Sequence, residues 1–219
     1  MTENVRIRKL DQEKEWQRIW VRQGIMTRII NAGRRVYNYF FLRMLSRYVT
    51  SETRLLELGS GTSSLLMQLA PNVKEVVGLD ITKASIDLSE NAAHEAGISN
   101  AHFILGDCLT YPFEPTYDIV WSQGLMEHFQ NPEDIAKAHL RALKPGGTAL
   151  ISVPYRYSYH TIWYLLTRPR ILRPLWPWTD QVFYNKRMLA EIGAKVTPHV
   201  RTFLLYPFFL GIAIVELKK

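Results

Sequence analysis

The spacing of apolar residues changes near residue 54. Before that point apolar side chains recur every three or four positions over residues 13–49, which predicts helix in two pieces, because Gly24 and Gly33 weaken its middle. Beyond it, short apolar runs rich in β-branched residues predict strands at 54–58, 75–79, 101–105, 117–121 and 148–153. Helical spacing between these runs predicts helices at 63–69, 83–96 and 132–143.

Strands that alternate with helices are typical of a parallel sheet covered on both faces. The end of the chain differs, because a helix predicted at 186–192 is followed by two strands, at 195–205 and 211–217. Their connection is too short for a parallel crossover, so we expect them to pair antiparallel. The sequence therefore predicts a doubly wound α/β fold, in which Gly146-Gly147 turns the chain into the strand at 148–153.

The composition is that of one globular domain with a substantial core, at 219 residues, 47% hydrophobic and 21% charged. Cys108 is the single cysteine, which excludes an internal disulfide and favours a reducing, cytoplasmic setting. The N-terminus lacks the apolar stretch of a secretory signal. The longest apolar run, residues 203–215, is too short to cross a bilayer and is interrupted by Pro207.

Charge is unevenly distributed along the chain. Residues 1–54 hold 12 Lys/Arg against 5 Asp/Glu, residues 55–153 hold 5 against 12, and residues 154–219 hold 10 against 3. An acidic middle is thus flanked by two basic segments, which together give the net charge of +7. Such asymmetry raises the question of what each segment binds.

Gly59 and Gly61 follow the first predicted strand and precede a helix, where a backbone without side chains can approach a ligand. The dinucleotide pattern requires a third glycine at the position of Ser64. Glu57 would repel a pyrophosphate, whereas it would attract a ligand with an ammonium and a sulfonium. These residues disfavour a dinucleotide oxidoreductase.

Two further acids end successive predicted strands. Asp80 can accept both hydroxyls of a ribose, and Asp107 can accept from an adenine amino group. The alternatives are that Asp80 caps the following helix and that Asp107 is an ordinary turn residue. Three acids at consecutive strand ends, beside a glycine loop, favour an adenosyl ligand.

Six segments in order and spacing resemble the motifs of class I S-adenosylmethionine-dependent methyltransferases: LLELGSGTSSL, VVGLDIT, GDCLTYPF, YDIVWSQGLMEHF, LKPGG and TALISVP. The resemblance covers about residues 54–154. It implies S-adenosyl-L-methionine as cofactor and a seven-stranded sheet in the order 3-2-1-4-5-7-6, with the last strand antiparallel. The third glycine of the family loop is Ser63 here, a variation that the family tolerates.

The resemblance also implies roles for individual residues. Those that hold the methionine end are Glu57, Gly59, Ser60 and Gly61, together with Ser122 and Gln123. Those that contact the adenosyl part are Asp80 at the ribose, Ile81 beside the adenine, Asp107 at its amine and Cys108 at a ring nitrogen through the backbone N–H.

His128 follows the fourth predicted strand and is the candidate general base, since a hydroxyl acceptor must lose a proton. The alternative is a structural Glu127-His128 pair that anchors its loop, as in many relatives. The pair also resembles a motif of quinone-pathway O-methyltransferases, which have another acid at the position of Gly124. Two side chains make a poor divalent-cation site, so we expect no metal.

The segment from residue 155 to 178 combines aromatic and basic residues and has no place in the minimal sheet. We expect it to form a lid and an acceptor pocket for an apolar or aromatic substrate, with His160 as a weaker base candidate. A basic connection that packs its aromatics on the core is the alternative. Contact with an anionic membrane surface is another interpretation.

We therefore expect a single methyltransferase domain over residues 1–219. Its parts are an N-terminal helical cap (1–53), a cofactor-binding core (54–154), a lid insertion (155–180) and a C-terminal helix and strand pair (181–219). The expected reaction is methyl transfer to O or N of a small apolar or aromatic acceptor. The alternatives are an RNA or other nucleic-acid methyltransferase, disfavoured because no RNA-binding module is recognisable, and a cofactor-binding protein without methyl-transfer activity.

Overall fold

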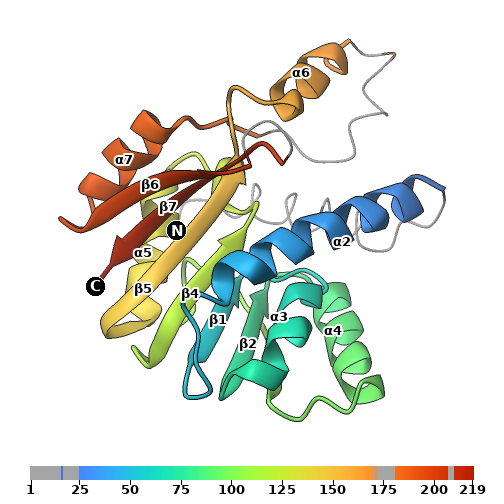
Figure 1. Cartoon of the computed structure of the whole chain (residues 1–219), viewed down its shortest axis with the longest axis vertical. Helices are drawn as coiled ribbons and strands as arrows, with labels where there is room; N and C mark the ends of the chain where they lie inside the picture. Colours follow the sequence, from blue (N-terminus) through green and yellow to red (C-terminus); the bar gives the residue numbers. More distant parts are fainter. Residues whose placement is uncertain (1–15, 17–24, 170, 172–180, 207–209) are drawn as a thin grey trace.

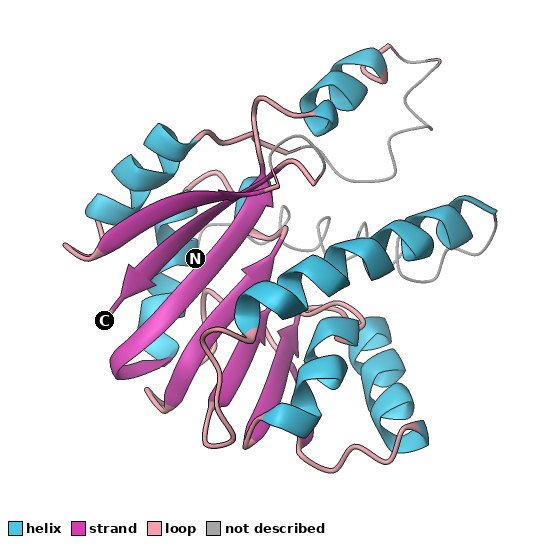
Figure 2. Ribbon diagram, in the orientation of Figure 1, coloured by secondary structure: helices cyan, strands magenta, loops and turns pink. Residues whose placement is uncertain are grey.

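Seven strands form one sheet in the computed structural model, which describes residues 16, 25–169, 171, 181–206 and 210–219 (Figures 1 and 2). The strands are β1 (Arg54–Leu58), β2 (Glu75–Asp80), β3 (Ala101–Leu105), β4 (Tyr117–Gln123), β5 (Leu143–Pro154), β6 (Val200–Leu205) and β7 (Ile212–Lys218). Their order, β3-β2-β1-β4-β5-β7-β6, confirms the predicted topology. Strands β1 to β5 are parallel, whereas β7 runs antiparallel to β5 and to β6.

Helices cover both faces of this sheet (Figure 1). They are α2 (Ile25–Leu45), α3 (Ser64–Leu69), α4 (Lys83–Glu95), α5 (Pro132–Ala142), α6 (Tyr159–Leu166) and α7 (Lys186–Ala194), with short 3₁₀ turns η1 (Ala70–Asn72) and η2 (Met126–His128). Apart from α6 and the two short turns, they begin or end within a few residues of the predicted helices, since hydrophobic spacing set those predictions. The part of the predicted helix that precedes residue 25 lies outside the described residues, apart from the helical Trp16.

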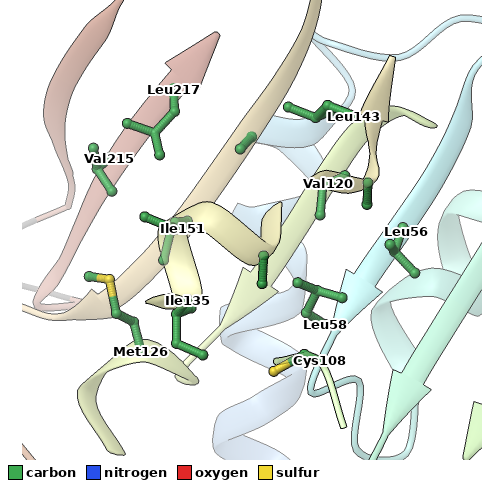
Figure 3. Close-up of a cluster of buried hydrophobic side chains, with 14 of the residues drawn as sticks. Leu56, Leu58, Cys108, Val120, Met126, Ile135, Leu143, Ile151, Val215 and Leu217 are labelled. Carbon is green, nitrogen blue, oxygen red and sulfur yellow. The ribbon is translucent and has the colours of Figure 1, made fainter. Parts of the chain in front are cut away.

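Alternating side chains of the strands build two apolar cores, as expected for a sheet buried on both faces. In β1, Leu56 and Leu58 face α5 and α7, in the cluster drawn in Figure 3. Leu55 faces the opposite way, toward Phe41 of α2 and Leu66 of α3. Both faces of the central strand are thus dry, which fixes its register against the neighbouring strands.

Gly146 and Gly147 were predicted to form a turn before the strand at 148–153. In the structure they lie within β5, which begins at Leu143. Strand β5 already pairs with β4 at Leu143, opposite Tyr117, and pairing resumes between Thr148 and Ile119. The intervening residues form a bulge within β5, where Gly146 has φ of 77°. Gly147 has no room for a side chain, because a Cβ atom would lie 3.1 Å from the carbonyl oxygen of Asp118.

Helix α6 was not predicted as a helix, and it stands beyond the carboxyl end of β5 (Figure 1). Its sequence, YHTIWYLL, lacks a polar face, so hydrophobic periodicity gives no signal there. Among the helices of the described ranges, none is both long and apolar enough to cross a membrane.

Candidate active site

The loop after β1 is held open by two glycines in the left-handed region, Gly59 with φ of 67° and Gly61 with φ of 54°. The backbone amides of Gly59 and Ser60 both donate to the carbonyl oxygen of Leu79, which ties the loop to β2. A Cβ atom on Gly59 would lie 2.8 Å from Cδ1 of Leu125. The glycine loop and the loop that carries the His128 candidate are therefore in close contact.

Glu57 is a buried carboxyl group directly below this loop, at 3% exposure. Its Oε2 atom has no hydrogen-bond partner among the described residues. Burial raises the pKa of Glu57 to about 8, the neighbouring Trp121 indole partly offsets the rise, and the charge of Asp80 adds to it. Such a group is available to bind a cation or a hydrogen-bond donor.

Trp121 lies beside Glu57 in the sheet, a contact that the sequence did not predict. Register pairs Glu57 with Trp121 of β4 on one side and with Gly78 of β2 on the other, so the three positions share one face of the sheet. The Trp121 indole Nε1 is also buried without a hydrogen bond of good geometry in the described part of the chain. Phe41 packs edge-on against this indole, at 5.1 Å between ring centroids.

Asp80 lies at the edge of the sheet, where its carboxylate accepts hydrogen bonds from neighbouring residues of the protein. Its Oδ2 atom accepts from the Gly61 amide at 2.9 Å, and Oδ1 accepts from the amide and hydroxyl of Thr82 and from the Ser85 hydroxyl. The carboxylate therefore ties the glycine loop to the start of α4, although the N-cap residue of that helix is Thr82 and not Asp80. Since a carboxylate offers about four acceptor sites and Oδ2 holds one bond, room for a ligand hydroxyl remains at Oδ2.

The third acid lies next to Asp80. The amide of Gly106, at the end of β3, donates to the backbone oxygen of Asp80 at 2.9 Å. Asp107 Oδ1 accepts from the Leu109 amide at 3.0 Å, which is the turn role we considered for it. Cys108 is buried, and desolvation, with smaller contributions from Asp107 and Asp80, raises its thiol pKa to about 12, so it is a packing residue rather than a nucleophile.

The remaining predicted residues are divided between the two faces of β4. Gln123 ends β4 two positions beyond Trp121, so its side chain lies on the same face of the sheet as those of Trp121 and Glu57. Ser122 points the other way, with Oγ 3.0 Å from Nε2 of His139 on α5. The side chain of Ser122 is thereby committed to the core, and only its backbone faces the ligand edge. Ile81 follows Asp80 and is partly exposed.

His128 ends η2 and is half-buried. The ring of Trp16 packs edge-on against it, with 5.0 Å between centroids and an angle of 84°. Its neighbour Glu127 is fully buried, has an Oε2 atom without a partner within the described residues, and has a pKa raised by burial to about 8. The alternative of a structural Glu127 agrees with its burial, whereas His128 remains accessible at the edge of the sheet.

These residues fit the expected cofactor. A buried carboxyl group with an unpartnered oxygen suits the cationic methionine end, whereas the Leu125 side chain lies against Gly59, with Cδ1 2.8 Å from the place of a Cβ atom. Asp80 ends β2, and Asp107 follows the adjacent strand β3 by two residues, so both acids lie at the edge of the sheet where an adenosyl ligand is expected. At its S-methyl group, this cofactor supplies an electrophilic methyl that a nucleophile can take.

Comparison with known proteins supports the same assignment. The family described as "Methyltransferase domain" matches residues 49–174, more than half of the chain. The chain is 28% identical over 102 residues to the uncharacterized methyltransferase YcgJ of Bacillus subtilis, which covers 46% of this chain and 40% of that protein. It is 25% identical over 175 residues to the ubiquinone biosynthesis O-methyltransferase of Proteus mirabilis, which covers 70% of this chain and 69% of the relative.

The fold is similar to that of the magnesium protoporphyrin IX methyltransferase of Synechocystis, whose structure contains S-adenosylhomocysteine. The TM-score is 0.70 at 18% identity, with 94% of this chain and 93% of that chain covered. The match to the Bacillus subtilis relative spans less than half of that protein's length. With the family match over residues 49–174, the chain belongs to the class I S-adenosylmethionine-dependent methyltransferases, and S-adenosylmethionine is its cofactor.

Proposed function

We propose that this chain transfers the S-methyl group to O or N of a small apolar or aromatic acceptor. The observation that carries the proposal is the contact between Trp16 and His128 at the carboxyl edge of β4, which sets an aromatic side chain beside a basic one. Methyl transfer is an in-line displacement, so the protein chiefly aligns the two reactants. The acceptor oxygen or nitrogen forms the new bond to carbon, the carbon–sulfur bond breaks, and the acceptor proton leaves to a base.

We assign the cofactor contacts to the residues gathered at this edge. Glu57, Gly59, Ser60, Gly61 and Gln123 hold the methionine end, with Ser122 contributing through its backbone. Asp80 and Ile81 hold the ribose and one face of the adenine, and Asp107 and the Cys108 amide hold the adenine edge. His128 is the proposed base, and residues 155–180 are the proposed lid of a domain that spans residues 1–219.

A methyl-transfer screen tests this proposal. Purified protein is incubated with S-adenosylmethionine and with phenols, quinones, amines, lipids or bulk RNA, and S-adenosylhomocysteine formation is measured. We expect turnover with an apolar or aromatic acceptor. Turnover with RNA alone would overturn the small-molecule proposal, and tight cofactor binding without any turnover would favour a binding protein.

The base assignment needs a separate readout. His128→Ala should lower kcat by about 10²- to 10⁴-fold for a hydroxyl acceptor and remove the acidic limb of its pH–rate profile, while cofactor affinity stays the same. His94→Ala, an exposed histidine on α4, is the matched control. Unchanged kcat in His128→Ala would leave the histidine as a structural partner of Glu127.

We also propose contact with an anionic membrane surface, which the exposed apolar side chains of α6 support.

A further inference from the structure

We propose that the outward face of α6, formed by Ile162, Leu165 and Leu166, docks on an anionic lipid bilayer. These side chains are 62%, 53% and 64% exposed. Their spacing of three and four residues places them on one side of the helix. A surface helix of a soluble domain normally buries apolar side chains, whereas α6 is apolar on both sides and has no fully buried residue.

Contacts on the opposite side of α6 hold it in this orientation. His160 Nε2 lies 2.8 Å from the Tyr37 hydroxyl of α2 and 3.0 Å from the carbonyl oxygen of Leu210. Farther along the helix, the ring of Tyr164 packs against Phe183, at 5.4 Å between centroids. Because the inner side is bonded to two separate parts of the fold, the apolar side cannot rotate into the core without breaking these contacts.

Charge favours a bilayer over a neutral apolar partner. Exposed arginines flank the helix on both sides, Arg156 before it and Arg168 after it. Residues 154–179 contain no Asp or Glu, so no acidic side chain of this segment opposes the attraction. Arginines near an anionic leaflet and apolar side chains in its acyl region act together in interfacial binding.

Two further large side chains that flank α6 in the sequence are exposed. Tyr157, two residues before the helix, is 67% exposed, and Ile171, beyond its end, is 86% exposed. Tyrosine is favoured at the headgroup level, where its ring is apolar and its hydroxyl is hydrated. The helix also stands beyond the carboxyl end of β5 (Figure 1), so docking would bring this edge of the sheet close to the lipid.

Flotation of the full-length protein with vesicles tests the proposal and requires neither cofactor nor acceptor, so it can fail independently of the proposed methyl transfer. We expect binding to phosphatidylcholine vesicles that contain phosphatidylglycerol, weaker binding to pure phosphatidylcholine, and a decrease as salt is raised. The double variant I162Q/L166Q should weaken binding at least about tenfold, since each apolar side chain removed from lipid contact contributes. Its matched control is Leu88→Gln, which changes a 45% exposed leucine on α4 and should leave binding unchanged.

The charge contribution has its own variant pair. R156Q/R168Q should weaken binding to the anionic vesicles by roughly fivefold per arginine. Lys74→Gln, at the opposite edge of the sheet before β2, removes one positive charge, as each arginine substitution does, and should have no effect. Cofactor affinity of every variant serves as the check that the fold is intact.

Three results would overturn the proposal. The first is that the wild-type protein does not float with the anionic vesicles, and the second is that Leu88→Gln loses as much binding as I162Q/L166Q. The third is that sedimentation velocity reveals a dimer that I162Q/L166Q dissociates while vesicle binding stays the same. That result would assign the outward face of α6 to a second copy of this chain.

Discussion

The hydroxyl of Tyr37 on α2 lies 2.8 Å from Nε2 of His160 on α6, although 123 residues separate them in sequence. The same hydroxyl donates to the Leu210 carbonyl oxygen at 2.8 Å and also contacts the Tyr159 hydroxyl. Burial lowers the pKa of His160, a shift that its contact with Leu210 partly offsets. Because the Leu210 carbonyl oxygen can only accept, Nε2 of the neutral ring holds the proton and shares it between that oxygen and the Tyr37 oxygen. One phenol therefore joins α2, α6 and Leu210, which lies two residues before β7.

Tyr37→Phe tests this junction by removing the hydroxyl alone. We expect the free energy of unfolding to fall by about 1–2 kcal/mol, because the bonds to His160 and Leu210 lose a partner in a half-buried site. Amide hydrogen exchange over residues 159–166 should accelerate more than exchange elsewhere. The matched control is Tyr39→Phe, on the same helix and 58% exposed, which should change neither quantity. Equal effects of both variants would show that the junction does not stabilise α6.

Glu57 should make the stability of the ligand-free protein depend on pH. Its folded pKa of about 8 lies above the unfolded value of 4.5, so its contribution is complete below pH 4.5 and is lost as the pH rises through 8. Glu57→Gln carries no such titration. Between pH 5 and pH 8 its unfolding free energy should therefore increase relative to wild type, by about 4 kcal/mol at most. Urea unfolding at several pH values measures this, with Glu114→Gln, at an exposed site, as the control.

The same carboxyl group predicts a proton linked to cofactor binding. At pH 7 the Glu57 carboxyl of the ligand-free protein is mostly protonated, whereas the cationic methionine end favours the carboxylate. We expect calorimetric titrations in buffers of different ionisation enthalpy to show release of close to one proton, and Glu57→Gln to abolish it. Release that persists in Glu57→Gln would assign the proton to another group, such as Glu127.

The glycine loop after β1 leaves no room for a side chain at Gly78 of β2. Gly78 lies below the loop, where a Cβ atom would be 2.8 Å from Ser60 Oγ and 2.9 Å from Ser63 Oγ. Gly78→Ala should therefore displace the loop, weaken cofactor binding by at least about tenfold and destabilise the fold by about 1–3 kcal/mol. Gly33→Ala is the contrasting change. It lies in α2 with nothing within 4 Å of the Cβ position, so it should stabilise the protein by about 1 kcal/mol.

The periodic features of the sequence predicted most of the fold. β1 and β3 begin and end where expected, since short β-branched runs between helices allow few alternatives. Glu57, Asp80 and Asp107 could be placed at one edge of the sheet, because parallel strands all end at the same edge. That inference does not require the register of the strands. The pairing of Glu57 with Trp121 does depend on register, and the Tyr37–His160 contact depends on tertiary packing, so neither was predicted. Sequence likewise gave no reason to expect that Ser122 turns toward α5.

His139 of α5 provides the last prediction, because its ring is fully buried between two polar partners. Nδ1 donates to the Ile135 carbonyl oxygen at 2.8 Å, so Nε2 accepts from the Ser122 hydroxyl at 3.0 Å and the ring is neutral. Burial lowers the pKa of His139 to about 4, below the unfolded value of 6.5. Its contribution to stability is therefore present above pH 6.5 and is lost as the pH falls through 4.

The imidazole C–H resonances of His139 should stay constant from pH 7 to pH 5.5 in the folded protein, and they should titrate over that range in the urea-unfolded chain. Ser122→Ala should destabilise the fold by about 1–3 kcal/mol, since Nε2 loses its donor in a dry site. If the folded resonances move near pH 6.5, water reaches this ring, and the Ser122–His139 bond does not close the core beneath the ligand edge.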